Sequence, residues 1–237
     1  MSTAPIALVG AGEYLPVMTE IERSLIEGRA PRYVQLATAA APEGEESLAR
    51  WHSLGRLQAE RLGVEQVVVD VRNRHDAQNE ELAALIQGAG LVYLSGGNPA
   101  FLADTLRDTL VWDAIVAAHE AGAAVAGCSA GAMALSSWAP RMRDLVHPDQ
   151  PTGLGLVDNV RVIPHFDKML GWVPDVLRNA LLHKPEGTML LGIDEDTALV
   201  GGPYEWTVQG RQSVWELGEG KRVEHPAGTT LTTPYSA

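Results

Sequence analysis

The stretch best suited to chemistry is Gly-Cys-Ser-Ala-Gly at residues 127–131. An apolar, β-prone run precedes this Gly-x-Ser-x-Gly pattern and a helix-prone run follows it, which is the strand–turn–helix context of a nucleophile elbow. The two glycines permit a tight turn, and the helix start brings backbone N–H groups near the Ser129 oxygen. Ser129 is therefore a predicted nucleophile. The pentapeptide alone would equally suit a small-residue turn or a phosphate cradle.

A serine hydroxyl needs a general base, because it is almost wholly protonated at neutral pH. Of the seven histidines, His165 follows an apolar strand in Val-Ile-Pro-His-Phe at residues 162–166. Strand ends of this kind are where α/β sheets place their sites, so His165 is the preferred base. His147, within a long loop, is the alternative. The others are expected to be structural or solvated, and they are His52, His75, His119, His183 and His225.

A third group is needed to orient the imidazole and stabilise its charged form. Residues 192–198, Gly-Ile-Asp-Glu-Asp-Thr-Ala, place three consecutive carboxylates at the end of another strand. Alternate residues of a strand face the same side, so Glu195 points opposite to Asp194 and Asp196. The periodicity leaves open which side faces the site, and an acidic turn exposed to water is the alternative interpretation.

Acyl chemistry also requires hydrogen-bond donors for the developing oxyanion. Residues 93–99, Tyr-Leu-Ser-Gly-Gly-Asn-Pro, follow a strand with two glycines that free the backbone to turn its N–H groups. The predicted pair of donors is Gly97 N–H and Ala130 N–H, although a plain turn before a helix beginning at Pro99 fits as well. Near the N-terminus, Gly-Ala-Gly at residues 10–12 lacks the third glycine of a dinucleotide fingerprint. No dinucleotide cofactor of the Rossmann type is expected. Glu13, which follows the first predicted strand, could contact a substrate amine.

The elements that must position these residues alternate between short strands and longer helices over the first 135 residues. This alternation predicts an α/β fold with a mainly parallel sheet flanked by helices. A covering helix is expected around residues 48–62, another at 79–89, and a longer one at 99–121 that breaks near Thr109. The predicted strands are residues 6–9, 33–37, 66–71, 91–94 and 123–126.

The second half is less regular. Residues 138–157 hold several Pro- or Gly-led turns and are expected to form a long loop. A strand at 160–163, a helix at 167–183, a strand at 189–193 and short hairpin-like strands through Thr232 should follow. Since no linker of Ser, Gly or charge repeats interrupts the chain, we expect one domain over residues 1–237 with short antiparallel C-terminal strands.

Composition excludes several classes of partner. The 237 residues carry a formal net charge of −12, which opposes binding to nucleic acid or to anionic membranes. The only cysteine, Cys128, rules out an internal disulfide and supplies too few thiolates for a structural zinc site. No apolar run approaches the roughly 20 residues that span a bilayer, and the start lacks a basic n-region, so a cytoplasmic location is expected.

Taken together, these motifs resemble the S51 family of serine peptidases, which includes dipeptidase E and cyanophycinase. The matching residues, in family order, are 95–98, 127–132, 153–156, 164–166 and 192–198. The resemblance implies a class I glutamine amidotransferase-like (flavodoxin-like) fold, with Ser129 as nucleophile, His165 as base and Glu195 as the orienting acid. The chain order Ser, His, Glu also differs from that of ordinary α/β-hydrolases, whose acid precedes the histidine.

The resemblance further implies a serine-type exopeptidase or dipeptidase that acts on short Asp- or β-Asp-containing peptides through an acyl-enzyme, with no cofactor. Pro99 and Ile163-Pro164 depart from the Gln and Asp-Gln common in cyanophycinase-like sequences, and Pro-His-Phe is closer to dipeptidase E. The stretch Ile-Asp-Glu-Asp-Thr-Ala at residues 193–198, in contrast, looks more like cyanophycinase. One alternative is a cyanophycinase-like exopeptidase acting on β-Asp-Arg polymer or dipeptide; another is a non-hydrolytic binding module. A third alternative is an enzyme that uses Cys128 as its nucleophile, and it is disfavoured because serine occupies the tip of the elbow. Homo-oligomerisation is left open.

Overall fold

The computed structural model describes residues 4–141, 150–169, 184–218 and 221–235. Its larger sheet has eight strands in the order β12-β9-β8-β1-β5-β4-β2-β3. Strands β1 to β5 run parallel to their neighbours within that group, whereas β8, β9 and β12 pair antiparallel. The bounds are β1 Ile6–Val9, β2 Arg32–Leu36, β3 Glu65–Val68, β4 Leu91–Leu94, β5 Ala124–Cys128, β8 Thr197–Gly201, β9 Glu205–Gly210 and β12 Thr230–Thr232.

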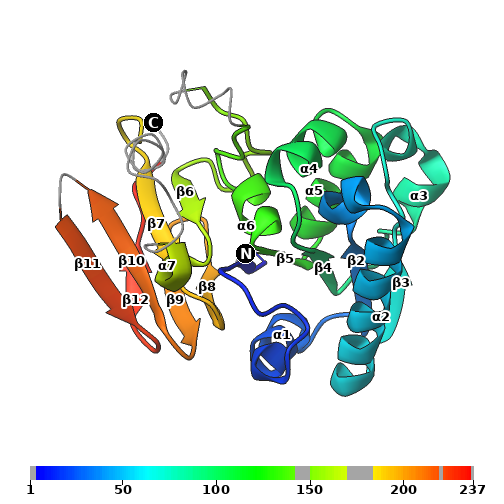
Figure 1. Ribbon diagram of the computed structural model, residues 1–237. Coiled ribbons are helices and arrows are strands. Elements are labelled where there is room, and N and C mark those ends of the chain that lie inside the picture. Colours follow the sequence, from blue (N-terminus) through cyan, green and yellow to red (C-terminus); the bar gives the residue numbers. More distant parts are fainter. Residues whose placement is uncertain (1–3, 142–149, 170–183, 219–220, 236–237) are drawn as a thin grey trace.

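A second sheet of four strands lies beside the first, in the order β11-β10-β7-β6 (Figure 1). It consists of β6 Val160–Ile163, β7 Met189–Ile193, β10 Ser213–Gly218 and β11 Lys221–Pro226. The backbones of the two sheets meet at Gly10, where a Cβ atom would come 2.1 Å from the carbonyl oxygen of Asp194. The sequence placed strands at 160–163 and 189–193 correctly but did not predict that they form a separate sheet.

Helices cover both faces of the large sheet because alternate strand residues point to opposite sides. Ile6 and Leu8 of β1 pack with α3 to α6, while Ala7 and Val9 pack with α1 and α2, which lie on the other side in Figure 1. The helix bounds are α1 Thr19–Ile26, α2 Glu45–Leu62, α3 Glu80–Ala84, α4 Pro99–Leu106, α5 Leu110–Glu120, α6 Ala130–Leu135 and α7 Phe166–Met169. Short 3-10 turns occupy Pro16–Met18, Thr38–Glu43 and Asp76–Gln78.

This arrangement confirms the predicted α/β class with a mainly parallel sheet and antiparallel strands near the C-terminus. The break near Thr109 is also confirmed, because the Thr109 hydroxyl caps α5 by accepting from Trp112 N–H at 3.4 Å. Helix α1 was not predicted, and α3 is shorter than the expected 79–89. Within the expected loop, 138–141 and 150–157 contain no helix or strand, while 142–149 lie outside the described residues, as does most of the helix expected at 167–183.

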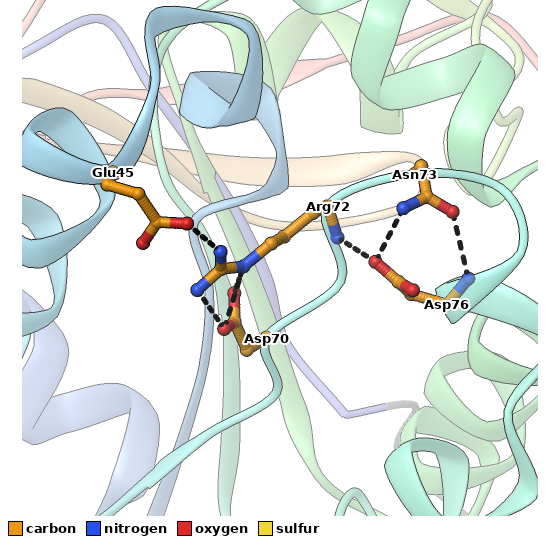
Figure 2. Close-up of polar contacts among 5 residues, drawn as sticks. All are labelled: Glu45, Asp70, Arg72, Asn73 and Asp76. Atoms are coloured by element: carbon orange, nitrogen blue, oxygen red, sulfur yellow. Dashed lines mark hydrogen bonds and ion pairs between the residues drawn. The ribbon is translucent and has the colours of Figure 1, made fainter.

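The chain leaving β3 is tied to the start of α2 by Arg72 (Figure 2). Its guanidinium pairs with Asp70, at 2.8 Å from Nη2 to Oδ2, and with Glu45. Its backbone N–H donates to Asp76 Oδ2 at 2.9 Å, and Asn73 Nδ2 donates to the same oxygen at 2.9 Å. These contacts fix the link that carries the chain from the sheet edge to α3.

Helix α1 buries an acidic side chain, Glu22, which is 1% exposed. Burial raises the pKa of this carboxyl to about 8, and interactions with Gln58 and Tyr33 offset the shift only in part. The folded protein therefore holds a proton here that the unfolded chain, with a pKa near the model-peptide value of 4.5, releases. Such a proton stabilises the fold at low pH, and its contribution is lost as pH rises from about 4.5 towards 8.

We expect Glu22→Gln, which mimics the protonated acid, to remove this pH dependence. The variant should match the wild-type free energy of unfolding at pH 4.5 and exceed it at pH 8 by about 3 to 5 kcal/mol. Guanidinium unfolding at a series of pH values measures the difference. Glu20→Gln on the exposed side of the same helix is the control and should change it by less than about 0.5 kcal/mol. An equal difference at both pH values would contradict a buried, protonated Glu22.

Candidate active site

Ser129 occupies the sharp turn between β5 and α6. Its backbone has φ 51° and ψ −107°, a conformation that side-chain-bearing residues rarely adopt, and its N–H donates to Val9 O at 2.9 Å. The turn closes tightly because a Cβ on Gly127 would lie 2.5 Å from the Gly131 carbonyl carbon. The two glycines of the motif are thus required by packing, and the strained backbone projects Ser129 from the carboxyl end of the central strands.

Ser129, His165 and Glu195 form a continuous hydrogen-bonded chain. Ser129 Oγ lies 3.1 Å from His165 Nε2, and His165 Nδ1 lies 2.9 Å from Glu195 Oε1. His165 follows β6 with φ 50°, and Glu195 follows β7, so the second sheet supplies both groups while the first supplies the serine. The His165 and Glu195 side chains are 45% and 35% exposed, which leaves room for a substrate to reach them.

The three neighbouring carboxylates take different directions. Glu195 faces His165, as the strand periodicity allowed, and its own backbone N–H donates to Asp167 Oδ1 at 3.0 Å. Asp194 turns the other way, where its Oδ2 accepts from Trp215 Nε1 at 3.0 Å, and burial raises its pKa. Asp196 lies 3.6 Å from Arg211. Of the three, only Glu195 contacts the imidazole.

Two further residues support Glu195 that sequence reasoning missed. The Asp167 side chain accepts a hydrogen bond from the Glu195 backbone N–H, and the Gln212 side-chain amide donates to the Glu195 carbonyl oxygen at 2.9 Å. Gln212 lies in the turn between β9 and β10, and nothing in its local sequence marks it. Asp167 stands two residues after His165, and this closeness in sequence could have marked it. We predicted it only as the start of a helix.

The loop after β4 leaves one backbone donor available. Ser95 N–H donates to Leu36 O at 3.0 Å, Gly96 N–H to Glu13 Oε1 at 3.1 Å, and Asn98 N–H to Ala39 O at 2.8 Å. Between them, Gly97 N–H has no acceptor in the described part of the chain. Gly97 has φ 138°, and a Cβ there would lie 2.4 Å from Ala39 O, so only glycine fits.

Ala130, the residue after Ser129, carries the second predicted donor. It is the first residue of α6, where a helical N–H has no partner within the helix. The two loops approach closely, because a Cβ on Gly96 would lie 3.5 Å from Ser129 Cβ. Gly97 N–H thus belongs to the loop that approaches the elbow, and Ala130 N–H belongs to the elbow itself. That the two bind an oxyanion stays a prediction.

Cys128 lies one residue before the serine and points away from His165. Its side chain is buried, and its Sγ donates to Glu13 Oε2 at 2.8 Å. Burial and the neighbouring Glu13 charge raise the pKa of the thiol, so the thiolate that a cysteine nucleophile needs is disfavoured. The alternative base His147 lies outside the described residues.

Neither a metal cluster nor a membrane helix is present in the parts of the chain that the structure describes. No three His, Cys, Asp or Glu side chains there are grouped so as to hold a metal ion. No helix among these residues is both long enough and apolar enough to cross a bilayer.

A hydrogen-bonded Ser–His–Glu chain on an α/β sheet is an arrangement that serine hydrolases also have. The chain belongs to peptidase family S51, whose sequence model matches residues 26–202. This confirms the family suggested by the motifs. The fold agrees too: a peptidase structure from an acI-B1 Actinobacterium is 43% identical, covers 97% of both chains and superposes with a TM-score of 0.90.

Other similarities are more distant. A putative peptidase E from Listeria monocytogenes EGD-e shares the fold, with a TM-score of 0.61, 18% identity, and coverage of 94% of this chain and 98% of that one. Cyanophycinases from Trichormus variabilis and from a Nostoc species are each 34% identical over 169 residues, which is 65% of this chain and 54% of theirs. The chain therefore spans about half the length of the curated relatives it matches.

Proposed function

We propose that the protein is a serine exopeptidase or dipeptidase that cleaves an amide bond in short peptides through an acyl-enzyme. The observation that supports this most directly is the hydrogen-bonded chain from Ser129 Oγ through His165 to Glu195. In a hydrolase of this kind the alcohol attacks only when a base can take its proton, and His165 Nε2 is within reach.

In the proposed mechanism, Ser129 Oγ attacks the peptide carbonyl carbon while His165 Nε2 accepts its proton. Glu195 holds the imidazole in place and stabilises its positive charge. Gly97 N–H and Ala130 N–H donate to the tetrahedral oxyanion. His165 then returns the proton to the leaving amine, which departs as the acyl-enzyme forms, and a water activated by His165 releases the acid.

A cavity lies beside Gly97. It measures about 550 Å³, and its lining includes Gly97, Asn98, Arg141 and the acidic Glu43. Arg141 forms an ion pair with Asp104, so a substrate carboxylate would have to share or displace that partner. An aspartyl or β-aspartyl carboxylate could take the same kind of contact, because Arg presents several N–H donors in a fork that matches carboxylate geometry.

We expect hydrolysis of one or more members of a panel of α- and β-aspartyl dipeptides, measured by release of free amino acid. Ser129→Ala protein, prepared identically, is the control for contaminating peptidases and should release none. A panel without aspartate, matched in size, tests the acidic preference. Binding of a dipeptide to both proteins without hydrolysis would instead identify a binding module, and the proposed catalytic function would be wrong.

A further inference from the structure

The turn that follows β1 is tied to the loop that follows β4 by two neighbouring side chains. Glu13 Oε1 accepts from Gly96 N–H at 3.1 Å, and the Tyr14 hydroxyl lies 2.6 Å from Ser95 Oγ. The turn itself is sharp, since Gly12 has φ 91° and Tyr14 has φ 63°. This backbone directs Glu13 towards the nucleophile elbow, although it is far from the elbow in sequence.

The second carboxylate oxygen of Glu13 contacts the elbow. Glu13 Oε2 accepts from Cys128 Sγ at 2.8 Å, one residue before Ser129. One half-buried carboxylate therefore bridges the two segments that carry the proposed oxyanion donors. Space at this point is restricted, because a Cβ on Gly96 would lie 2.6 Å from Glu13 Oε1.

The hydrogen bond to Gly96 constrains the amide that follows it. Three of the four N–H groups of residues 95–98 have acceptors, and Glu13 provides the only one that is a side chain. The remaining donor, Gly97 N–H, has an orientation set by its two neighbours, since peptide planes allow only two soft torsions per residue. Without Glu13, the Ser95–Gly96 peptide plane, which carries Gly96 N–H, would lose its side-chain acceptor. The Gly96 torsions that orient the next plane, which carries Gly97 N–H, would then be less restricted.

We infer that Glu13 is a positioning residue, whose carboxylate holds the Ser95–Gly96 peptide plane and thereby restricts how the next plane presents Gly97 N–H to the oxyanion. This inference rests on the proposed serine hydrolase function. A competing role follows from charge. Among the described residues Glu13 takes part in no ion pair, so a substrate ammonium could bind it. The two roles predict different behaviour of the glutamine variant, because Gln keeps the oxygen acceptor and loses the charge.

The test compares Glu13→Ala with Glu13→Gln on a cleaved dipeptide and on p-nitrophenyl acetate, an ester that has no amine. For a positioning role, Glu13→Ala should lower kcat by about 10- to 100-fold on both substrates with KM within threefold. Glu13→Gln should recover to within about fivefold of wild type. A peptide aldehyde forms a tetrahedral adduct with the serine, so its inhibition constant should rise in the variants in proportion to the loss of kcat. The inhibition constant of the dipeptide's acid product should not change.

Several results would overturn the inference. If Glu13→Gln lowers kcat as much as Glu13→Ala does, and only on the dipeptide, Glu13 binds a substrate amine instead. Unchanged kcat in Glu13→Ala would remove any role in positioning. The ¹⁵N–¹H shift of Gly96 supplies a test without substrate: it should move in Glu13→Ala and stay near wild type in Glu13→Gln. If the wild-type protein hydrolyses neither substrate, the proposed function fails, while an unmoved Gly96 shift would separately refute the contact.

Discussion

Ser129→Ala is expected to lower kcat by at least about a thousandfold on any peptide that the wild-type protein cleaves. The variant keeps the elbow backbone and the flanking amides, so it should fold and bind substrate, but it lacks the oxygen that attacks the carbonyl carbon. Steady-state kinetics on a dipeptide measures the loss. Labelling by a fluorophosphonate, read by intact mass, should also disappear.

Cys128→Ala is the matched comparison, because it alters the residue immediately before the serine. Its Sγ donates to Glu13 and its buried thiol has a raised pKa, so we expect at most about a tenfold loss and normal fluorophosphonate labelling. A larger loss in Cys128→Ala than in Ser129→Ala would make the thiol the nucleophile and would reject the serine mechanism.

Glu195→Gln should lower kcat by about 10²- to 10⁴-fold with little change in KM. Glutamine retains an oxygen near His165 Nδ1 but not the negative charge that stabilises the imidazolium, and its NH₂ group favours the wrong tautomer. Initial rates at saturating dipeptide, together with circular dichroism to verify folding, provide the measurement.

Asp196→Asn is the control for Glu195→Gln, since it removes the adjacent carboxylate, which lies near Arg211 and does not contact His165. Its kcat should stay within about threefold of wild type. Equal losses in the two variants would mean that the acidic segment acts through its overall charge, and that Glu195 has no special role beside the imidazole.

Much of the site was predictable because its residues follow strands. Residues at the carboxyl ends of β4, β5, β6 and β7 meet at one region, so Gly97, Ser129, His165 and the acidic segment could be found from their positions after apolar runs. The choice among the three carboxylates could not be made from spacing. It depends on which face of β7 meets Trp215 of β10, and that pairing is a long-range contact.

The contacts of Glu13, Asp167 and Gln212 had no comparable local signal. Glu13 Oε1 and Gly96 N–H are 83 residues apart in sequence, and their hydrogen bond depends on the sharp turn after β1. Helix α1 was missed for a different reason. Met18, Ile21 and Leu25 have helical spacing and are buried, but the segment is short and rich in charge, so its apolar face is narrow.

The close approach of backbones at Gly10 has a consequence for how this site can change in evolution. The proposed attacking alcohol and the imidazole that would activate it belong to different sheets, and the Gly10–Asp194 apposition lies at the junction between them. Even the methyl group of an alanine at position 10 would force the two sheets to move apart. The placement of Ser129 relative to His165 thus depends on a main-chain contact, so substitutions of side chains elsewhere should disturb it less than a substitution at Gly10 would.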